Sequence, residues 1–216
     1  MLASVALVGG VLSRSYNPPM PADRLTRQIA FLVEADRLKS VTRRTSLVDG
    51  SRLENSAEHS WHLALAAIIL REYAAAPVDL VRVLELVVVH DLVEIDAGDA
   101  FAYDTAAQSI RAQREEAAAD RLFGLLPPEQ AAYVRDLWEE FEARQTIESQ
   151  FANALDRLQP LLQNASSDGG SWRTHDLTRA DVLRRMAPVE TAMPAIWPTV
   201  VEIVDAFCAA GVLKSA

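Results

Sequence analysis

The residues of this chain best suited to chemistry are two histidines and two aspartates in three separate segments. His90 and Asp91 are adjacent at the end of an apolar run, and His59 and Asp156 lie far from them on either side. Two imidazole nitrogens and two carboxylates form a mixed ligand set that suits Mn, Fe, Co, Ni or Zn better than Ca. A His-Asp pair alone is weak evidence, because a surface or hydrogen-bonded histidine is commoner, and the chain repeats the dipeptide at His175-Asp176.

The context of the first pair strengthens the metal hypothesis. Glu94 follows His90 by four residues, so a helix would place both on one face, and the preceding run is apolar. A charged cluster in a buried environment needs partners, and a cation supplies them. Asp156 also lies among apolar residues, although an ion pair with Arg157 is an alternative explanation for its position.

The elements that would carry these residues are helices almost throughout. We expect Ser56 and Thr146 to cap two of them and Gly98 to end a third. A long polar connection, residues 40–55, contains the turn signal Asp49-Gly50. In the helix after it, we expect the core side to consist of Trp61, Leu63, Leu65, Ala66 and Ile69. The sequence predicts an all-α bundle with helices at about 22–39, 56–75, 77–95, 104–124, 127–144 and 147–164, followed by two shorter ones.

Composition limits the classes of partner. A chain of 216 residues that is 50% hydrophobic and 24% charged is long enough for one packed domain and is not a disordered protein. Its net charge of −9 argues against a nucleic acid polymer as partner, because such binding needs a basic stripe. The apolar stretch Leu2–Leu12 is too short to span a membrane and has no basic residue before it, so we expect no membrane partner. Cys208 is the only cysteine, so no disulfide can form within the chain, and this favours a location in the reducing cytoplasm.

The order His…His-Asp…Asp on an all-α chain resembles the HD superfamily of metal-dependent phosphohydrolases, and most closely its 5′-nucleotidase branch, which hydrolyses nucleoside monophosphates. The matching stretches are Leu38–Arg43, Glu54–Trp61, His90–Asp99 and Leu155–Leu158, with weaker similarity at 114–117 and 137–140. The resemblance implies a single HD-domain helical bundle over residues 21–216. Its motifs lie within about 25–165. Outside them, the residue pattern itself predicts a tail of uncertain order at 1–20 and additional helices within about 177–212.

The resemblance also implies roles for individual residues. The metal ligands would be His59, His90, Asp91 and Asp156. Glu94 would be the acidic residue beside a metal-activated water, and Asp99 would contact the sugar or help to hold the site. The phosphate would be bound by Arg43, and Lys39 and Arg52 are further candidates for that role.

One metal is expected rather than two. Relatives with two metals take additional histidines from the interval between Asp91 and Asp156, and this chain has none there. His62 is a candidate for a position behind the ligands or facing the substrate, with an ordinary helix-face histidine as the alternative. The branch often has an aromatic residue after the arginine at position 43, where it helps to select deoxyribose; Arg44 stands there instead. This departure leaves the choice of sugar open.

Three functions follow from these observations. The first is hydrolysis of nucleoside 5′-monophosphates, with deoxynucleotides as the expected substrates, by a homodimer. The second is hydrolysis of nucleoside triphosphates or pyrophosphates on the same scaffold, which would need more basic residues than the connection offers. The third is a non-catalytic protein that binds metal or nucleotide, which the retention of all four ligands together with Glu94 and Asp99 disfavours.

Overall fold

The computed structural model describes residues 24–99, 108–175 and 177–214, and in that part of the chain helices dominate. The only strands there form a two-stranded antiparallel sheet. Short 3₁₀ turns η1 and η2 cover Asp36–Ser40 and Arg71–Tyr73. The other elements, in chain order, are α1 Arg24–Ala35, β1 Thr42–Ser46, β2 Leu53–Asn55, α2 Ser56–Leu70, α3 Leu80–Val89, α4 Glu94–Ala97, α5 Gln108–Phe123, α6 Pro128–Ala143, α7 Ile147–Ser166, α8 Gly170–Thr174, α9 Arg179–Ala192 and α10 Trp197–Ala209.

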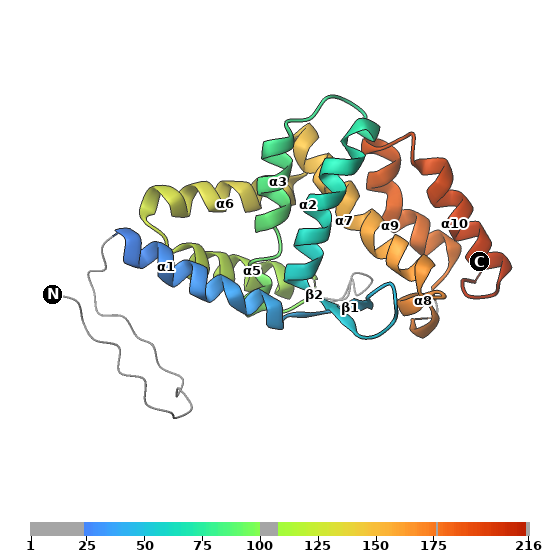
Figure 1. The fold of residues 1–216 in the computed structure, drawn as a ribbon, viewed down its shortest axis with the longest axis horizontal. Coiled ribbons are helices and arrows are strands. Elements are labelled where there is room, and N and C mark those ends of the chain that lie inside the picture. The colour runs from blue at the N-terminus through green and yellow to red at the C-terminus, as the bar shows by residue number, and fades with distance from the viewer. Residues whose placement is uncertain (1–23, 100–107, 176, 215–216) are drawn as a thin grey trace.

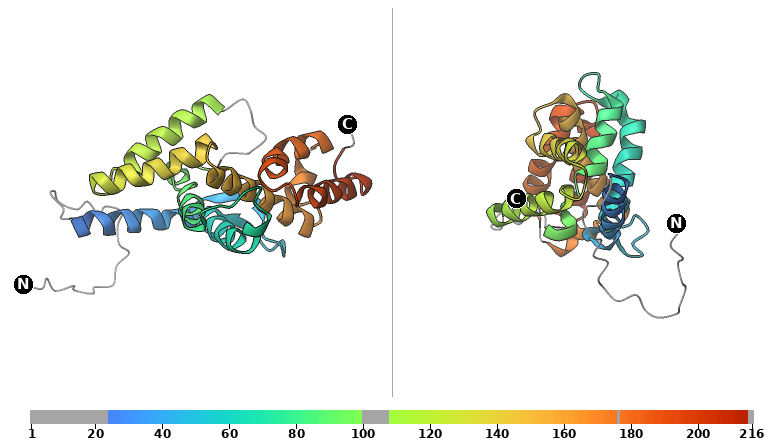
Figure 2. Two further views of the ribbon diagram at one scale, coloured as in Figure 1. Left: turned by 90° about the horizontal axis from the view of Figure 1, so that it is seen from above. Right: turned by 90° about the vertical axis from the view of Figure 1, so that its left-hand side faces the viewer.

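The helices form an elongated bundle with α2, α3 and α7 in the middle (Figure 1). At one end lie α1, α5 and α6, and at the other α8, α9 and α10, an arrangement that the view from above also shows (Figure 2). The central helix is α7, which packs against α2, α3, α6 and α9. More than half of its residues are buried, including both apolar and polar side chains. The all-α bundle predicted from the sequence is confirmed.

The polar connection before α2 is not the loop that the sequence predicted. Strands β1 and β2 form a hairpin in which Thr42 pairs with Asn55 and Ser46 with Leu53. Gly50 lies in the turn with φ +69°, a conformation that glycine adopts without strain. The strands are short and polar, so they lack the alternation of apolar residues by which a strand is recognised.

Two details of α2 also differ from expectation. Its cap is Asn55, whose side chain accepts a hydrogen bond from the Glu58 amide in a capping box, so Ser56 is already the first helical residue. Of the side chains expected on the core side, Leu63 is buried but Trp61 is 65% exposed. Leu65 and Ile69 are exposed as well. Because α2 is apolar on every side, helical periodicity alone could not show which face packs inward.

The third predicted helix is divided in two. Asp79 caps α3 because its side chain accepts a hydrogen bond from the Val81 amide, and α3 ends at Val89. The next residues form tight turns with hydrogen bonds from Leu92 to Val89 and from Glu94 to Asp91. His90 and Glu94 are therefore on either side of a turn rather than stacked on one continuous helix. Gly98 ends α4 at φ +76°, as predicted.

Other predicted boundaries agree with the structure. Thr146 caps α7 with a capping box, and α6 begins at Pro128. The helices α9 and α10 lie where further helices were expected. The predicted tail, residues 1–20, lies outside the described residues. Among the described helices, none has both the length and the apolar character needed to cross a bilayer.

Candidate metal centre

Three helices bring the four predicted metal ligands together. His59 lies in the first turns of α2, His90 and Asp91 follow the last residue of α3, and Asp156 is in the middle of α7. All four side chains are buried. His59, His90 and Asp91 each have one potential ligand atom within 4.8 Å of the other two. Asp156 adjoins this group through His59, at 3.0 Å.

The His90 ring is oriented as a metal ligand. Its Nδ1 lies 2.9 Å from the carbonyl oxygen of Val87, which can only accept, so Nδ1 carries the hydrogen and Nε2 a lone pair. Nε2 is buried and makes no hydrogen bond, although Asp91 Oδ1 is 3.0 Å away. The ring also packs against Phe141. A buried lone pair beside a carboxylate is a position that a cation satisfies.

The His59 ring is also oriented as a metal ligand. Nδ1 lies 3.0 Å from Gln159 Oε1, and Nε2 lies 3.0 Å from Asp156 Oδ1. With the hydrogen on Nδ1, two lone pairs face each other at Nε2 and Oδ1. Two ligand atoms bound ~2.1 Å from one ion at a right angle are ~3.0 Å apart, so this spacing fits a shared cation. Burial and the charge of Arg43 lower the pKa of His59, which keeps the ring neutral as a ligand must be.

Asp156 is held in its ionised form. Burial by itself would raise the pKa of this carboxyl group, but Arg157 and His59 outweigh that effect and hold the pKa well below its usual value. Arg157 forms an ion pair with Asp156. The ion pair considered from the sequence therefore exists beside the contact to His59. One carboxylate oxygen pairs with Arg157 and the other lies against His59.

Arg43 reaches the cluster from strand β1. Its Nη1 donates a 2.9 Å hydrogen bond to Asp91 Oδ2, and its side chain is only 11% exposed. Burial would lower the pKa of Arg43, but the carboxylates of Asp91 and Asp156 outweigh burial and raise it. Arg43 is thus a buried fixed cation beside the ligands. A guanidinium there can bind an anionic group that approaches the cluster.

Glu94 and Asp99 adjoin the same cluster. Glu94 Oε2 accepts a 2.7 Å hydrogen bond from Ser56 Oγ, and the side chain is buried. Burial, together with the charges of Asp91 and Asp99, raises the pKa of Glu94 well above its usual value. Burial also raises the pKa of Asp99, although Arg43 opposes this. A carboxyl group with a raised pKa suits proton transfer near neutral pH.

Most of these residues line a pocket of about 370 Å³, but His59 is not among the lining residues. This volume is within the range of small-molecule sites, roughly 300–1,000 Å³. His90, Asp91, Glu94, Asp99 and Asp156 all line it. The pocket also contains six arginines, which are Arg43, Arg44, Arg111, Arg144, Arg157 and Arg185. Six carboxylates also line the pocket and balance this charge, so an anionic ligand would be bound there together with a cation.

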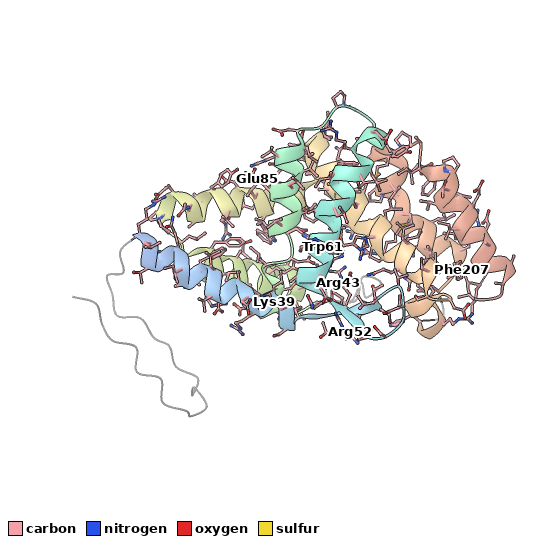
Figure 3. All side chains as sticks on the ribbon, viewed as in Figure 1. Lys39, Arg43, Arg52, Trp61, Glu85 and Phe207 are labelled. Atoms are coloured by element: carbon pink, nitrogen blue, oxygen red, sulfur yellow. The ribbon has the colours of Figure 1, made fainter. Side chains whose placement is uncertain are left out.

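Lys39 and Arg52 are not among the residues that line the pocket. Lys39 forms an ion pair with Asp36, and Arg52 forms one with Glu58. Figure 3 shows both near the hairpin and the foot of α2, close in projection to Arg43. Burial separates the three, because Lys39 and Arg52 have exposed side chains and Arg43 does not. Their role in binding phosphate stays a prediction that their position does not support.

The remaining histidines lie outside the ligand cluster. His62 stacks on Trp61, and its Nδ1 is 3.3 Å from Gln159 Nε2, so it adjoins the residue behind His59. His175 lies at the end of α8, where its Nδ1 is 2.9 Å from the carbonyl oxygen of Ser171. Its neighbour Asp176 lies outside the described residues.

The buried polar residues behind the ligands were not among the predicted site residues. Gln159 contacts His59, and Glu54 contacts Gln159. Helical spacing was an available signal, since Asp156, Gln159 and Gln163 occupy one face of α7. Arg111 of α5, Arg144 just after α6 and Arg185 of α9 were not predicted to line a pocket either, because they come from segments far apart in the chain.

Comparison with known proteins is consistent with this geometry. A family model described as HD domain matches residues 35–197. The chain belongs to the HD domain family. This HD-domain protein is also similar to a crystal structure of a predicted metal-dependent phosphohydrolase from Magnetospirillum magnetotacticum MS-1. The TM-score is 0.85 and the identity 48%, over 90% of this chain and 98% of that one.

Curated relatives of the HD-domain protein are more distant. The 5′-deoxynucleotidase HDDC2 of Xenopus laevis is 32% identical over 51% of this chain and 53% of its own length. The protein of the same name from Homo sapiens is 29% identical over 62% of this chain and 65% of its own length. The HD-domain protein thus aligns with only about half to two thirds of the length of these relatives.

Proposed function

We propose that this HD-domain protein is a metal-dependent phosphomonoesterase that hydrolyses nucleoside 5′-monophosphates, with deoxynucleotides preferred, to nucleoside and phosphate. The observation that carries this proposal is the buried His59–His90–Asp91 cluster at the wall of an arginine-lined pocket. The similarity to proteins named 5′-deoxynucleotidase supports the choice of substrate.

The chain's own residues supply most of the requirements of this reaction. His59, His90, Asp91 and Asp156 would hold one divalent ion, with Mn, Co, Fe, Ni or Zn matching the donor set. Such an ion lowers the pKa of water and polarises a phosphoryl oxygen. Arg43 would bind the phosphate through a charge-assisted, forked hydrogen bond, replacing part of its interaction with Asp91.

Glu94 and Asp99 would act beside the phosphate. Glu94, with its raised pKa and its hydrogen bond from Ser56, would accept the proton of the attacking water. Asp99 lines the pocket next to it and would contact the sugar or hold the site. Neither residue needs to bind the ion in this assignment.

The test is phosphate release from a panel of nucleoside mono-, di- and triphosphates, in ribose and deoxyribose forms, with Mn²⁺ or Co²⁺. We expect turnover of monophosphates and a preference for deoxyribose. If the loaded protein binds nucleotide but releases no phosphate, the protein is a binding protein instead.

One observation favours hydrolysis of di- or triphosphates as a second candidate. A longer phosphate chain needs more cations than the hairpin provides, and the pocket adds Arg111, Arg144, Arg157 and Arg185 from other elements. Two of these also pair with carboxylates, Arg111 with Glu115 and Arg157 with Asp156. The same substrate panel separates the two candidates.

We propose further that the protein forms a homodimer through the outer faces of α2 and α3. Exposed apolar side chains gather there, namely Trp61, Leu65, Ile68, Val81 and Val88, and the two helices pack side by side. Two copies that each carry a charge of −9 repel each other overall. However, α2 has no acidic residue between His59 and Arg71 that would add to this repulsion at the proposed interface. An apolar face of this kind suits a second copy. A cytoplasmic location remains a prediction.

A further inference from the structure

Glu54, on strand β2, is a buried carboxylate that lies behind the metal cluster rather than in the pocket. It is 2% exposed and does not line the pocket. Its Oε1 accepts hydrogen bonds from Gln159 Nε2 at 2.8 Å and from Gln163 Nε2 at 2.7 Å. Its Oε2 is buried and makes no hydrogen bond. Burying a carboxylate with one unpaired oxygen costs free energy. The role of Glu54 should therefore be evident from the residues that it contacts.

The contact with Gln159 determines the state of the His59 ring. Burial raises the pKa of Glu54, but the charge of Arg43 and the two glutamine NH₂ groups oppose this effect. Because Oε1 accepts from both NH₂ groups, the NH₂ group of Gln159 must face Glu54 and its oxygen must face His59. His59 Nδ1 must then carry a hydrogen, which leaves the lone pair on Nε2. Nε2 is the nitrogen that points at Asp156, 3.0 Å away, and at Asp91, 3.9 Å away.

The second oxygen of Glu54 lies between Arg43 and His59, and its distance to His59 Nδ1, 3.7 Å, is too long for a hydrogen bond but places negative charge beside the nitrogen that carries the hydrogen. Arg43 Nε lies 3.7 Å from Glu54 Oε2, and neither atom makes a hydrogen bond. The two residues are neighbours across the hairpin, each one position from the Thr42–Asn55 pair. Their opposite charges attract in a buried setting, where screening is weak. Glu54 therefore fixes the base of the guanidinium whose other end contacts Asp91.

We propose that Glu54 is a positioning residue with two outputs. Through Gln159 it sets the tautomer of His59 so that Nε2 can bind a metal ion, and directly it holds Arg43 for phosphate. The second output rests on the phosphate role proposed above for Arg43. The first requires only that His59 be a ligand.

The first output is tested on the histidine ring itself. Long-range ¹H–¹⁵N NMR of the metal-free full chain distinguishes Nδ1–H from Nε2–H rings, and the chain has only four histidines. We expect the Nδ1–H form for His59 in the parent protein and a mixture in Gln159→Leu. Optical titration with Co²⁺ should show about 10- to 100-fold weaker binding in that variant. An Nε2–H ring in the parent protein would overturn the first output without any variant.

Gln163→Leu is the matched control. Gln163 has the same residue type, helix, burial and hydrogen-bond acceptor as Gln159 but does not contact His59. We expect its His59 tautomer to match the parent and its Co²⁺ affinity to lie within about threefold. Equal losses in both glutamine variants would indicate general loosening of α7 and would refute the route through Gln159.

The second output is tested with Glu54→Gln. The amide oxygen can still accept from Gln159 and Gln163, so the His59 tautomer and Co²⁺ affinity should be retained. The new NH₂ group would face the Arg43 Nε donor, and inorganic phosphate should bind the Co²⁺-loaded protein about tenfold more weakly by calorimetry. Unchanged phosphate binding would overturn the second output. None of these readouts needs turnover, so an inactive parent protein would refute the proposed function and leave this inference to be judged on its own results.

Discussion

Replacement of Arg43 by alanine should weaken substrate use while strengthening metal binding. Arg43 donates to Asp91 Oδ2 at 2.9 Å and lies 4.0 Å from Asp156 Oδ1, with its side chain 11% exposed. It therefore competes with a metal ion for the same carboxylates and presents positive charge to phosphate. Removing Arg43 should therefore strengthen binding of the metal ion and weaken binding of the phosphate.

The magnitudes follow from burial. A charge-assisted contact to phosphate contributes roughly 1.5–3 kcal/mol, or about one to two decades in kcat/KM. At an effective dielectric constant near 20, unit charges 4 Å apart interact by about 4 kcal/mol, so loss of a buried cation should tighten Co²⁺ binding by about tenfold or more. Without metal, Arg43→Ala leaves the carboxylates uncompensated, and the free energy of unfolding should fall by about 3 kcal/mol.

Three measurements check this prediction. They are kcat/KM at saturating Mn²⁺, the Co²⁺ dissociation constant, and urea unfolding with and without metal. Arg52→Ala is the matched control, because Arg52 belongs to the same hairpin but pairs with Glu58 away from the pocket. We expect Arg52→Ala to keep kcat/KM and the Co²⁺ dissociation constant within about twofold of the parent values, and its free energy of unfolding close to that of the parent protein.

Two results would refute the reasoning. If Arg43→Ala kept kcat/KM within about twofold of the parent protein, Arg43 would not bind the phosphate. If it lost metal affinity instead of gaining it, Arg43 would support the ligands rather than compete for them.

Three further predictions concern the ion, the acid–base residue and the assembly. Dialysis against EDTA should abolish phosphate release and Mn²⁺ or Co²⁺ should restore it, whereas activity that survives excess chelator would count against a metal-dependent reaction. Glu94→Gln should lower kcat by about 10²–10⁴-fold while retaining metal that Asp91→Ala loses; equal metal loss in both would make Glu94 a ligand. Burial and the charges of Asp91 and Asp99 raise the pKa of Glu94 in the metal-free protein, so parent activity should fall as the pH is lowered and Glu94 is protonated, and an acidic limb that persists in Glu94→Gln would contradict this role. Trp61→Glu should convert a dimer to a monomer in sedimentation experiments with the helical content unchanged, whereas a monomeric parent protein would remove the basis for that interface.

The helical architecture was predictable from the sequence because its signals are local. Capping at Thr146, the proline at the start of α6 and the glycine at the end of α4 act within one turn of chain. The errors occurred where local signals were ambiguous. Trp61, Leu65 and Ile69 were assigned to the core of α2, but all three are exposed, because a helix that is apolar on every side does not reveal which face packs inward.

The sequence by itself determined the types of donor atom, the order of the ligands and the helices that carry them. It could not determine which cations reach the site, because Lys39, Arg43 and Arg52 all come from one polar segment. The tertiary structure buries Arg43 against Asp91 and leaves the other two in exposed ion pairs. Only the tertiary structure also showed which nitrogen of His59 faces the cluster, since Glu54 and Gln159 decide this from positions 105 residues apart. Local propensities act over a few residues, whereas a buried polar network is satisfied only when distant segments have packed together.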